Sequence, residues 1–209
     1  MLRKSLASFA LLSSLVLGQG CPYLYRQENA LTEQLTEQQQ KNKTAVLLID
    51  MQDYFLKDVA EAELEKEIPH QIAVLRYAQQ HGLPIYVLEL ERPQNDDRKE
   101  TTQRLKMVLN DGHYRTIIKR EKNGFQKTNL ESLLSRGGVE QLVLMGVYAS
   151  FCVQSTARGA IERGYSIITS PELIADAAEA EGYYESIDWY ERKGKVFATH
   201  EKLLEYLKE

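Results

Sequence analysis

Short apolar runs alternate with helix-like segments from residue 44 onward, and this alternation restricts the fold more than any other feature. The runs are too short for helices and rich in β-branched residues, which predicts strands over 44–50, 84–90, 115–119, 140–146, 165–170 and 195–199. The segments between them predict helices over 69–82, 98–112, 128–136, 152–163 and 200–209, the first beginning at Pro69. Strands of nearly continuous apolar residues between helices indicate a three-layer α/β sandwich, with a mainly parallel sheet of about six strands and helices on both faces.

The first 20 residues have a different character. Arg3 and Lys4 precede the uncharged run 5–17, and small residues follow it. A basic start, a short apolar run and small residues near a cleavage point are typical of a secretory signal. The run is shorter than the roughly 20 apolar residues that a transmembrane helix needs. We therefore expect residues 1–20 to be a signal peptide and the protein to be exported.

Cys21 directly follows Gly20, and this junction resembles the lipobox of bacterial lipoproteins, whose cysteine is lipidated. We expect Cys21 to carry a lipid that anchors the protein to a membrane. Simple secretion, for example into a periplasm, and a retained anchor or misread start stay open as alternatives. Residues 21–43 are polar and rich in glutamine, which predicts a solvated tether. The folded domain is then expected over 44–209.

Charge and cysteine content exclude two classes of protein. Because residues 1–20 hold only Arg3 and Lys4 as charges, the rest of the chain has 24 basic residues against 30 acidic ones, a net charge of −6. Proteins that bind nucleic acid need a basic surface, so such a partner is not expected. Cys21 and Cys152 are the only cysteines, and a lipidated Cys21 would leave Cys152 without a partner in the chain. The chain therefore has no disulfide framework.

Three chemically capable residues stand where the predicted strands end. Asp50 ends the first predicted strand, Lys119 ends the third, and Cys152 follows the fourth at the start of a predicted helix. Taken alone, each has an ordinary interpretation: a turn residue, a solvated charge and a small apolar filler. In parallel α/β sheets, however, ligands bind at the carboxyl ends of the strands. Together the three residues favour a functional site at that edge.

The chemistry of these residue types suits acyl transfer. A free thiol has a pKa of about 8.5, and a helix N-terminus or a nearby ammonium such as that of Lys119 favours the thiolate. A carboxylate such as Asp50 can take the thiol proton and return it to a leaving amine. Backbone N–H groups in the turn before the helix can hold the oxyanion of a tetrahedral intermediate. Such a site is suited to amides and related C–N bonds.

Three segments resemble the motifs of the isochorismatase-like cysteine hydrolases, the nicotinamidase/isochorismatase superfamily. The segments are 44-TAVLLIDMQDYF-55, 119-KREKNGFQKTNL-130 and 146-GVYASFCVQSTARGAIERGYSIIT-169. The resemblance runs from Thr44 to the C-terminus, with the motifs in the family's order and spacing. It implies that Asp50 is the acid/base, Lys119 the charge partner and Cys152 the nucleophile. Lys122 is the rival for the lysine role, and the spacing of six residues to Phe125 selects Lys119.

The resemblance also implies details of the turn before the nucleophile. The family places a cis peptide there, which falls at Val147–Tyr148, and the N–H groups of Tyr148 and Cys152 become the oxyanion donors. Around this turn, the residues expected to line a substrate pocket are Gln52, Phe55 and Phe151. For Phe55, core packing is an equal alternative.

Departures from the family narrow the expected activity. Nicotinamidases of this family bind a metal through an Asp and two His residues, and residues 91–100, after the second predicted strand, contain no His. We therefore expect no metal and no other cofactor, and do not favour nicotinamide as substrate. Ala149-Ser150 replaces the usual Thr-Asp before the cysteine.

The acidic stretch 58–67 is expected to be a solvated loop or helix face. The aromatic cluster 183–190 is expected to be a lid, a subunit contact or core packing.

The sequence thus predicts an exported, lipid-anchored hydrolase that cleaves a small-molecule amide or related C–N bond through a thioester on Cys152. Homo-oligomers occur in the family, so an oligomer is possible by analogy. One alternative is an isochorismate-type hydrolase of vinyl ethers, which does not depend on the cysteine. Another is a non-catalytic, membrane-anchored binding or scaffold protein.

Overall fold

The structure is a computed structural model, and it describes residues 43–209 with the exception of 94, 97 and 179. The predicted signal peptide, the lipidation of Cys21 and nearly all of the tether therefore lie outside the described residues. Within the described ranges, no helix combines the length and the hydropathy that crossing a membrane requires.

A parallel sheet forms the centre of the domain. Its strands are β1 (Thr44–Ile49), β2 (Ile85–Leu90), β3 (Tyr114–Lys119), β4 (Gln141–Val147), β5 (Ser166–Thr169), β6 (Ile174–Ala175) and β7 (Lys195–Val196). The order is β3-β2-β1-β4-β5-β7, with β6 paired to β4, and every strand pair is parallel. The predicted parallel sheet is confirmed.

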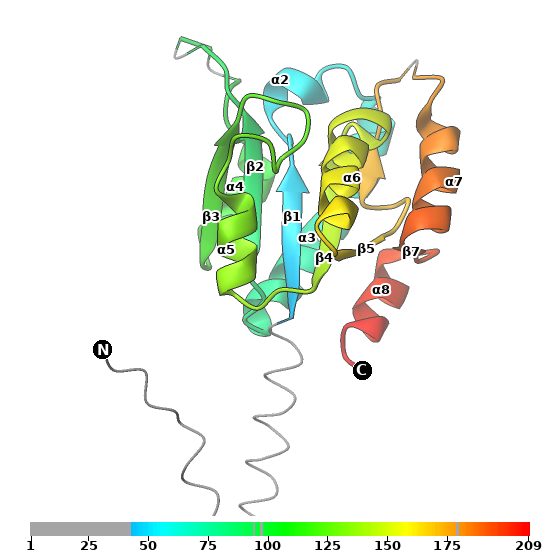
Figure 1. Ribbon diagram of the computed structural model, residues 1–209. Coiled ribbons are helices and arrows are strands. Elements are labelled where there is room, and N and C mark those ends of the chain that lie inside the picture. The colour runs from blue at the N-terminus through cyan, green and yellow to red at the C-terminus, as the bar shows by residue number, and fades with distance from the viewer. Residues whose placement is uncertain (1–42, 94, 97, 179) are drawn as a thin grey trace, which may run out of the picture. The chain divides into compact units, whose positions relative to one another are not determined.

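Helices cover both faces of this sheet, as predicted. They are α2 (Asp53–Leu56), α3 (Glu61–Gln80), α4 (Gln103–Leu109), α5 (Leu130–Arg136), α6 (Gln154–Glu162), α7 (Tyr183–Lys193) and α8 (His200–Tyr206). A π-helical turn, η2 (Ala149–Val153), directly precedes α6. In Figure 1, α5 and α6 lie in front of the sheet and α3 lies behind it.

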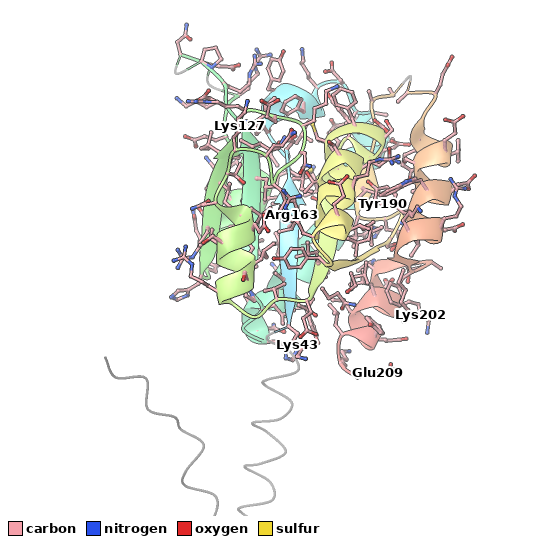
Figure 2. All side chains as sticks on the ribbon, viewed as in Figure 1. Lys43, Lys127, Arg163, Tyr190, Lys202 and Glu209 are labelled. Carbon is pink, nitrogen blue, oxygen red and sulfur yellow. The ribbon has the colours of Figure 1, made fainter. Side chains whose placement is uncertain are left out.

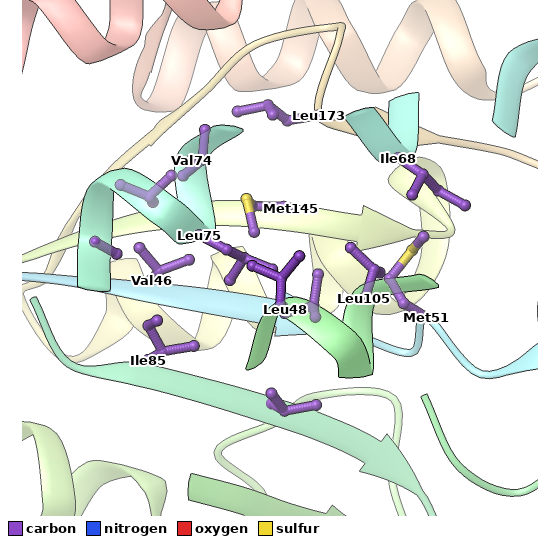
Figure 3. Packing of buried hydrophobic residues seen from close by; sticks show 14 of the residues in the cluster. Val46, Leu48, Met51, Ile68, Val74, Leu75, Ile85, Leu105, Met145 and Leu173 are labelled. Atoms are coloured by element: carbon purple, nitrogen blue, oxygen red, sulfur yellow. The ribbon is translucent and has the colours of Figure 1, made fainter. Parts of the chain in front are cut away.

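Alternate side chains of the central strand β1 pack into two apolar cores, one on each face of the sheet. Val46 and Leu48 of β1 pack with α3, α4 and α8, whereas Ala45, Leu47 and Ile49 pack with α5, α6 and α7. This division follows from the strand period of two, since successive side chains point to opposite faces. Figure 3 shows the first core, where side chains of β1, α3 and α4 meet. Because both faces are covered, every residue of β1 is buried.

The start of α3 differs from the prediction. The helix begins at Glu61, so Pro69 lies inside it rather than at its first turn. Proline within a helix removes one backbone hydrogen bond and crowds the preceding turn. Burial of Leu64 and Ile68 against the sheet outweighs this cost. The acidic stretch 58–67 thus contributes the first turns of a packed helix.

The aromatic cluster 183–190 forms most of α7, which the sequence analysis did not predict as a helix. Trp189 and Tyr190 are buried in the second core, so core packing is the outcome for these two side chains. The following strand, β7, stops at Val196, three residues earlier than predicted.

Gly146 fixes how closely β4 approaches β1 at the carboxyl edge of the sheet. It pairs with Ile49 and has φ of +123°, a conformation that disfavours side chains. A Cβ atom built on Gly146 would lie 2.0 Å from the carbonyl oxygen of Ile49. Glycine is therefore required where the chain turns toward the predicted site.

Candidate active site

The structure brings Asp50 and Lys119 together. Asp50 follows β1 with φ of +53°, and Lys119 is the last residue of β3, two strands away. The Lys119 side chain spans the end of β2, and its Nζ lies 2.8 Å from Asp50 Oδ2. Both side chains are buried, at 0% and 1% exposure. The strand-end argument therefore placed these two residues correctly.

Not every polar atom of the Asp50–Lys119 pair has a hydrogen-bond partner. Lys119 Nζ also donates to the backbone oxygen of Glu121 at 3.2 Å. Asp50 Oδ1 is buried and has no hydrogen-bond partner of normal geometry among the described residues. Burial raises the pKa of the Asp50 carboxyl, and the Lys119 ammonium opposes that rise. The result is a buried carboxylate with one oxygen held by a cation and the other available to a neighbour.

Cys152 is that neighbour, and its environment keeps the thiol protonated. Burial, followed by the Asp50 carboxylate, raises the pKa of the thiol to about 12, and Lys119 opposes this rise. The sequence analysis expected Lys119 and a helix N-terminus to favour the thiolate. In the structure Cys152 lies inside η2 rather than at the first turn of α6, and its burial outweighs the ammonium. The pKa of the thiol is therefore shifted in the direction opposite to the one expected from the sequence.

The turn before Cys152 has the backbone form that the resemblance implies. The Val147–Tyr148 peptide is cis. The carbonyl oxygen of Tyr148 accepts hydrogen bonds from the backbone N–H groups of Phe151 (3.0 Å) and Val153 (3.2 Å). These bonds close η2 around the cysteine.

Two residues that sequence reasoning missed hold η2 in place. Asp176 Oδ2 accepts a hydrogen bond from the N–H of Ser150 at 2.8 Å. Tyr190, labelled in Figure 2, lies on α7, and its Oη donates to the oxygen of Ala149 at 2.8 Å. Asp176 follows the two-residue strand β6, which is too short to be recognised in a sequence, and Tyr190 lies in a helix that was not predicted. The aromatic cluster 183–190 was the one available signal.

Tyr148 links the turn to the segment after β1. Its Oη donates to the oxygen of Phe55 at 2.9 Å and lies 3.1 Å from Asp58 Oδ2. The rings of Tyr148 and Phe55 meet edge to face, with centroids 5.9 Å apart. Burial and the Asp58 carboxylate raise the pKa of the Tyr148 phenol. Phe55 also packs against the first core.

The remaining predicted residues have distinct surroundings. Gln52 is fully buried, and its amide exchanges two hydrogen bonds with the backbone of Leu90, at 3.0 and 2.8 Å. It thereby fastens the segment after β1 to the end of β2. Phe151 is 47% exposed, and Lys122 Nζ lies 3.6 Å from its ring centroid. Lys122 thus contacts Phe151, whereas Lys119 contacts Asp50.

Potential metal ligands do not gather around Asp50 and Cys152. Within the part of the chain that the structure describes, one group of His, Cys, Asp and Glu side chains is close enough to hold an ion, and it consists of His70, Glu172 and His200. None of these residues belongs to the predicted site.

Comparison with known proteins gives the family. The sequence matches the family model described as the Isochorismatase domain over residues 44–202, well over half of the chain. Enterobactin synthase component B of Escherichia coli (strain K12) is 26% identical over 178 residues, which cover 77% of this chain and 62% of that protein. The chain thus aligns with less than two thirds of that relative's length.

Solved structures share the fold. N-carbamoylsarcosine amidase from Thermoplasma acidophilum superposes with a TM-score of 0.61 and 23% identity, covering 74% of this chain and 95% of that one. The nicotinamidase from Staphylococcus aureus has a TM-score of 0.64 and 21% identity, covering 75% and 98%. At these identities the likeness concerns the fold alone. The match to the family model over residues 44–202 shows that the chain belongs to the isochorismatase family of hydrolases.

Proposed function

We propose that this protein is a cysteine hydrolase that cleaves a small-molecule amide or related C–N bond through a thioester on Cys152. The observation that carries the proposal is the buried Asp50–Lys119 pair beside Cys152, with Asp50 Oδ1 free of other partners. A buried thiol, a carboxylate of raised pKa and a fixed ammonium are the parts that nucleophilic acyl transfer needs.

In the proposed first step, Asp50 Oδ1 takes the proton from Cys152 Sγ while Sγ attacks the carbonyl carbon. Because the thiol pKa is about 12, proton transfer must accompany attack rather than precede it. The tetrahedral intermediate then expels the amine, which takes the proton back from Asp50, and a thioester remains. Water activated by Asp50 hydrolyses the thioester and restores the thiol.

Lys119 orients Asp50 throughout and favours its ionised form before each proton transfer, since it opposes the rise in pKa that burial causes. The backbone N–H groups of Tyr148 and Cys152 are proposed to hold the oxyanion. The resemblance to the family implies this assignment, and the neighbouring N–H groups of Ser150, Phe151 and Val153 are bonded within the fold.

Structural neighbours named as amidases agree with C–N bond chemistry. The family model carries the name of isochorismatase, so hydrolysis of a vinyl ether is the second candidate. The two differ in their need for the thiol. An amidase of this kind loses turnover with Cys152→Ala, whereas a vinyl ether hydrolase keeps it.

The test is ammonia release from a panel of small primary amides and N-carbamoyl amino acids, with isochorismate as a separate probe. We expect turnover of a panel member by the wild type and none by Cys152→Ala. Intact mass spectrometry after an acid quench should detect an acyl adduct on the wild type only. Isochorismate turnover that survives Cys152→Ala would select the second candidate. Binding without turnover of any probe would indicate a non-catalytic binding protein.

We also propose that Cys21 is lipidated and anchors the exported domain, which rests on the sequence of residues 1–21. Expression of the full chain in a bacterium with labelled fatty acid tests this. We expect label in the wild type and none in Cys21→Ala. If neither the wild type nor Cys21→Ala carried label, the protein would be secreted without a lipid anchor.

A further inference from the structure

A second cluster of ionisable side chains lies apart from the Asp50–Lys119 pair. His70 comes from α3, Glu172 follows β5, and His200 begins α8; we refer to these three residues as the histidine cluster. One nitrogen of each imidazole and one carboxylate oxygen all lie within 4.8 Å of one another. Glu172 Oε2 is 2.7 Å from His200 Nδ1 and 3.9 Å from His70 Nδ1.

The cluster contains donor atoms that nothing in the described part of the chain satisfies. His70 Nδ1 is buried and has no hydrogen-bond partner. Glu67 lies three residues earlier on the same face of α3, is 4% exposed, and its Oε2 is likewise buried without a partner. Glu67, His70 and Glu172 line one pocket of about 270 Å³. Buried polar atoms are normally paired, so two unpaired polar atoms on residues that line one pocket mark a place where a ligand can bind.

We propose that the histidine cluster binds a divalent transition metal of the zinc type, with Glu67 beside the open coordination position. Two imidazoles and one carboxylate are a known donor set for zinc sites that keep a fourth position open. Donors on a tetrahedral zinc lie about 3.3 Å apart, given bonds of roughly 2.0–2.2 Å. The two nitrogen–oxygen distances, 2.7 and 3.9 Å, bracket that separation. This site departs from the sequence analysis, which predicted no metal.

Binding requires a small rearrangement of the imidazoles. The rings of His70 and His200 are stacked, with centroids 4.2 Å apart and 21° between their planes. An ion must lie near the plane of each ring that binds it, so the rings must tilt apart. The ion would replace the hydrogen bond between His200 Nδ1 and Glu172, while the backbone N–H of His200 continues to hold Glu172 Oε2 at 2.8 Å.

A metal at this position would fasten three segments together. His70 lies on the long helix α3, Glu172 lies in the loop between β5 and β6, and His200 is the first residue of α8. A ligand that binds only the folded state raises the melting temperature, by an amount that grows with the logarithm of its concentration relative to its Kd. The proposal does not depend on hydrolysis at Cys152, so stability and spectroscopy can test it separately.

The experiment titrates the full chain carrying Cys152→Ala with Co²⁺, followed by visible absorption, and then displaces Co²⁺ with Zn²⁺. The Cys152→Ala background removes the thiol of the predicted site as a competing ligand. We expect saturable binding of one ion and a loss of affinity of at least about tenfold in His200→Ala and in His70→Phe. His70→Phe keeps an aromatic ring stacked on His200, so a folding defect is not expected. His113→Ala, at an exposed histidine, is the matched control and should bind normally.

Thermal unfolding provides the second readout. Zn²⁺ should raise the melting temperature of the control and leave that of His70→Phe unchanged. Equal Co²⁺ spectra in His70→Phe and His113→Ala, or no saturable binding at all, would overturn the proposal. In either case the cluster would be a metal-free contact between α3 and α8.

Discussion

The Asp50–Lys119 pair and the histidine cluster both contain a carboxylate, but different groups balance its negative charge. Buried Asp50 has a cation built into the chain, with Lys119 Nζ 2.8 Å from its Oδ2. Glu172 Oε2 lies 2.7 Å from His200 Nδ1 and 3.9 Å from His70 Nδ1, and buried Glu67 accepts a hydrogen bond from the neutral amide of Gln71. A permanent cation allows a carboxylate to stay ionised without solvent. Burial raises the pKa of Glu67, and it therefore favours either the neutral carboxyl or a cation recruited from outside.

The two groups also differ in what positions them. The backbone N–H of Asp50 bonds Leu88 O at 2.9 Å, and the oxygen of Lys119 accepts from Glu91 N at 2.8 Å, so both residues are fixed by the sheet. His70 and His200 project from helices that are held by side-chain packing. We therefore expect mutations at the pair to change chemistry and stability together, and mutations at the cluster to change stability alone.

Replacing Lys119 by Met should have the largest effect. Removing one partner of a buried ion pair costs about 3–5 kcal/mol, because the other charge is left uncompensated. Without the ammonium, the pKa of Asp50 rises further above its usual value. A raised pKa in the folded state means that stability is lost as pH rises through that pKa. Urea unfolding should therefore show a larger deficit at alkaline than at acidic pH, and amide turnover should be lost.

The matched control for Lys119→Met is Lys122→Met. Lys122 contacts the exposed ring of Phe151 and not Asp50, so its removal should change the free energy of unfolding by less than about 0.5 kcal/mol. Equal effects of the two substitutions would mean that the buried pair has no special role.

Asp50→Asn should lower turnover but raise the reactivity of the Cys152 thiol toward alkylation. Loss of the general base is expected to lower turnover about 10²–10⁴-fold. The same change removes a negative charge that raises the thiol pKa, so that pKa should fall. Alkylation of Cys152 at mildly alkaline pH should then become faster, because the thiolate is the reactive form.

The measurement is the pH profile of iodoacetamide alkylation beside the pH profile of turnover. In the wild type, turnover should decline toward acid as Asp50 becomes protonated, at a pH above the usual range of an aspartate. Slower alkylation of Asp50→Asn than of wild type would contradict the proposed position of the carboxylate against the thiol.

The pair could be predicted from the sequence because each residue ends an apolar run, and parallel sheets bring strand ends together. The histidine cluster could not be predicted from the sequence. The helix was expected to begin at Pro69, which left His70 at its first turn rather than its middle. Glu172 lies in a loop with no motif, and the contact between α3 and α8 depends on tertiary packing. The raised pKa of Cys152 was also not predicted, because a sequence shows which residues are neighbours but not how deeply they are buried.

Glu172→Gln should have a smaller effect than Lys119→Met. It weakens the hydrogen bonds from the backbone N–H and Nδ1 of His200, and hydrogen bonds to charged groups contribute about 1.5–3 kcal/mol. Urea unfolding with a chelator present measures this loss without metal. Turnover of the folded variant should match the wild type, since Glu172 lies outside the proposed catalytic residues. A large loss of turnover would mean that the two groups are coupled.

Tyr190→Phe should have the smallest effect and tests what holds the cysteine. The substitution removes the hydrogen bond from Tyr190 Oη to Ala149 O and keeps the ring, so we expect a loss of about 1 kcal/mol in the free energy of unfolding. Val147 pairs with β6, and Tyr148 O still binds the N–H groups that close η2. The pH profile of Cys152 alkylation should therefore stay unchanged. A shifted profile would show that α7, and not only the sheet, positions the nucleophile. The Asp50–Lys119–Cys152 site would then depend on helix packing in the same way as the histidine cluster.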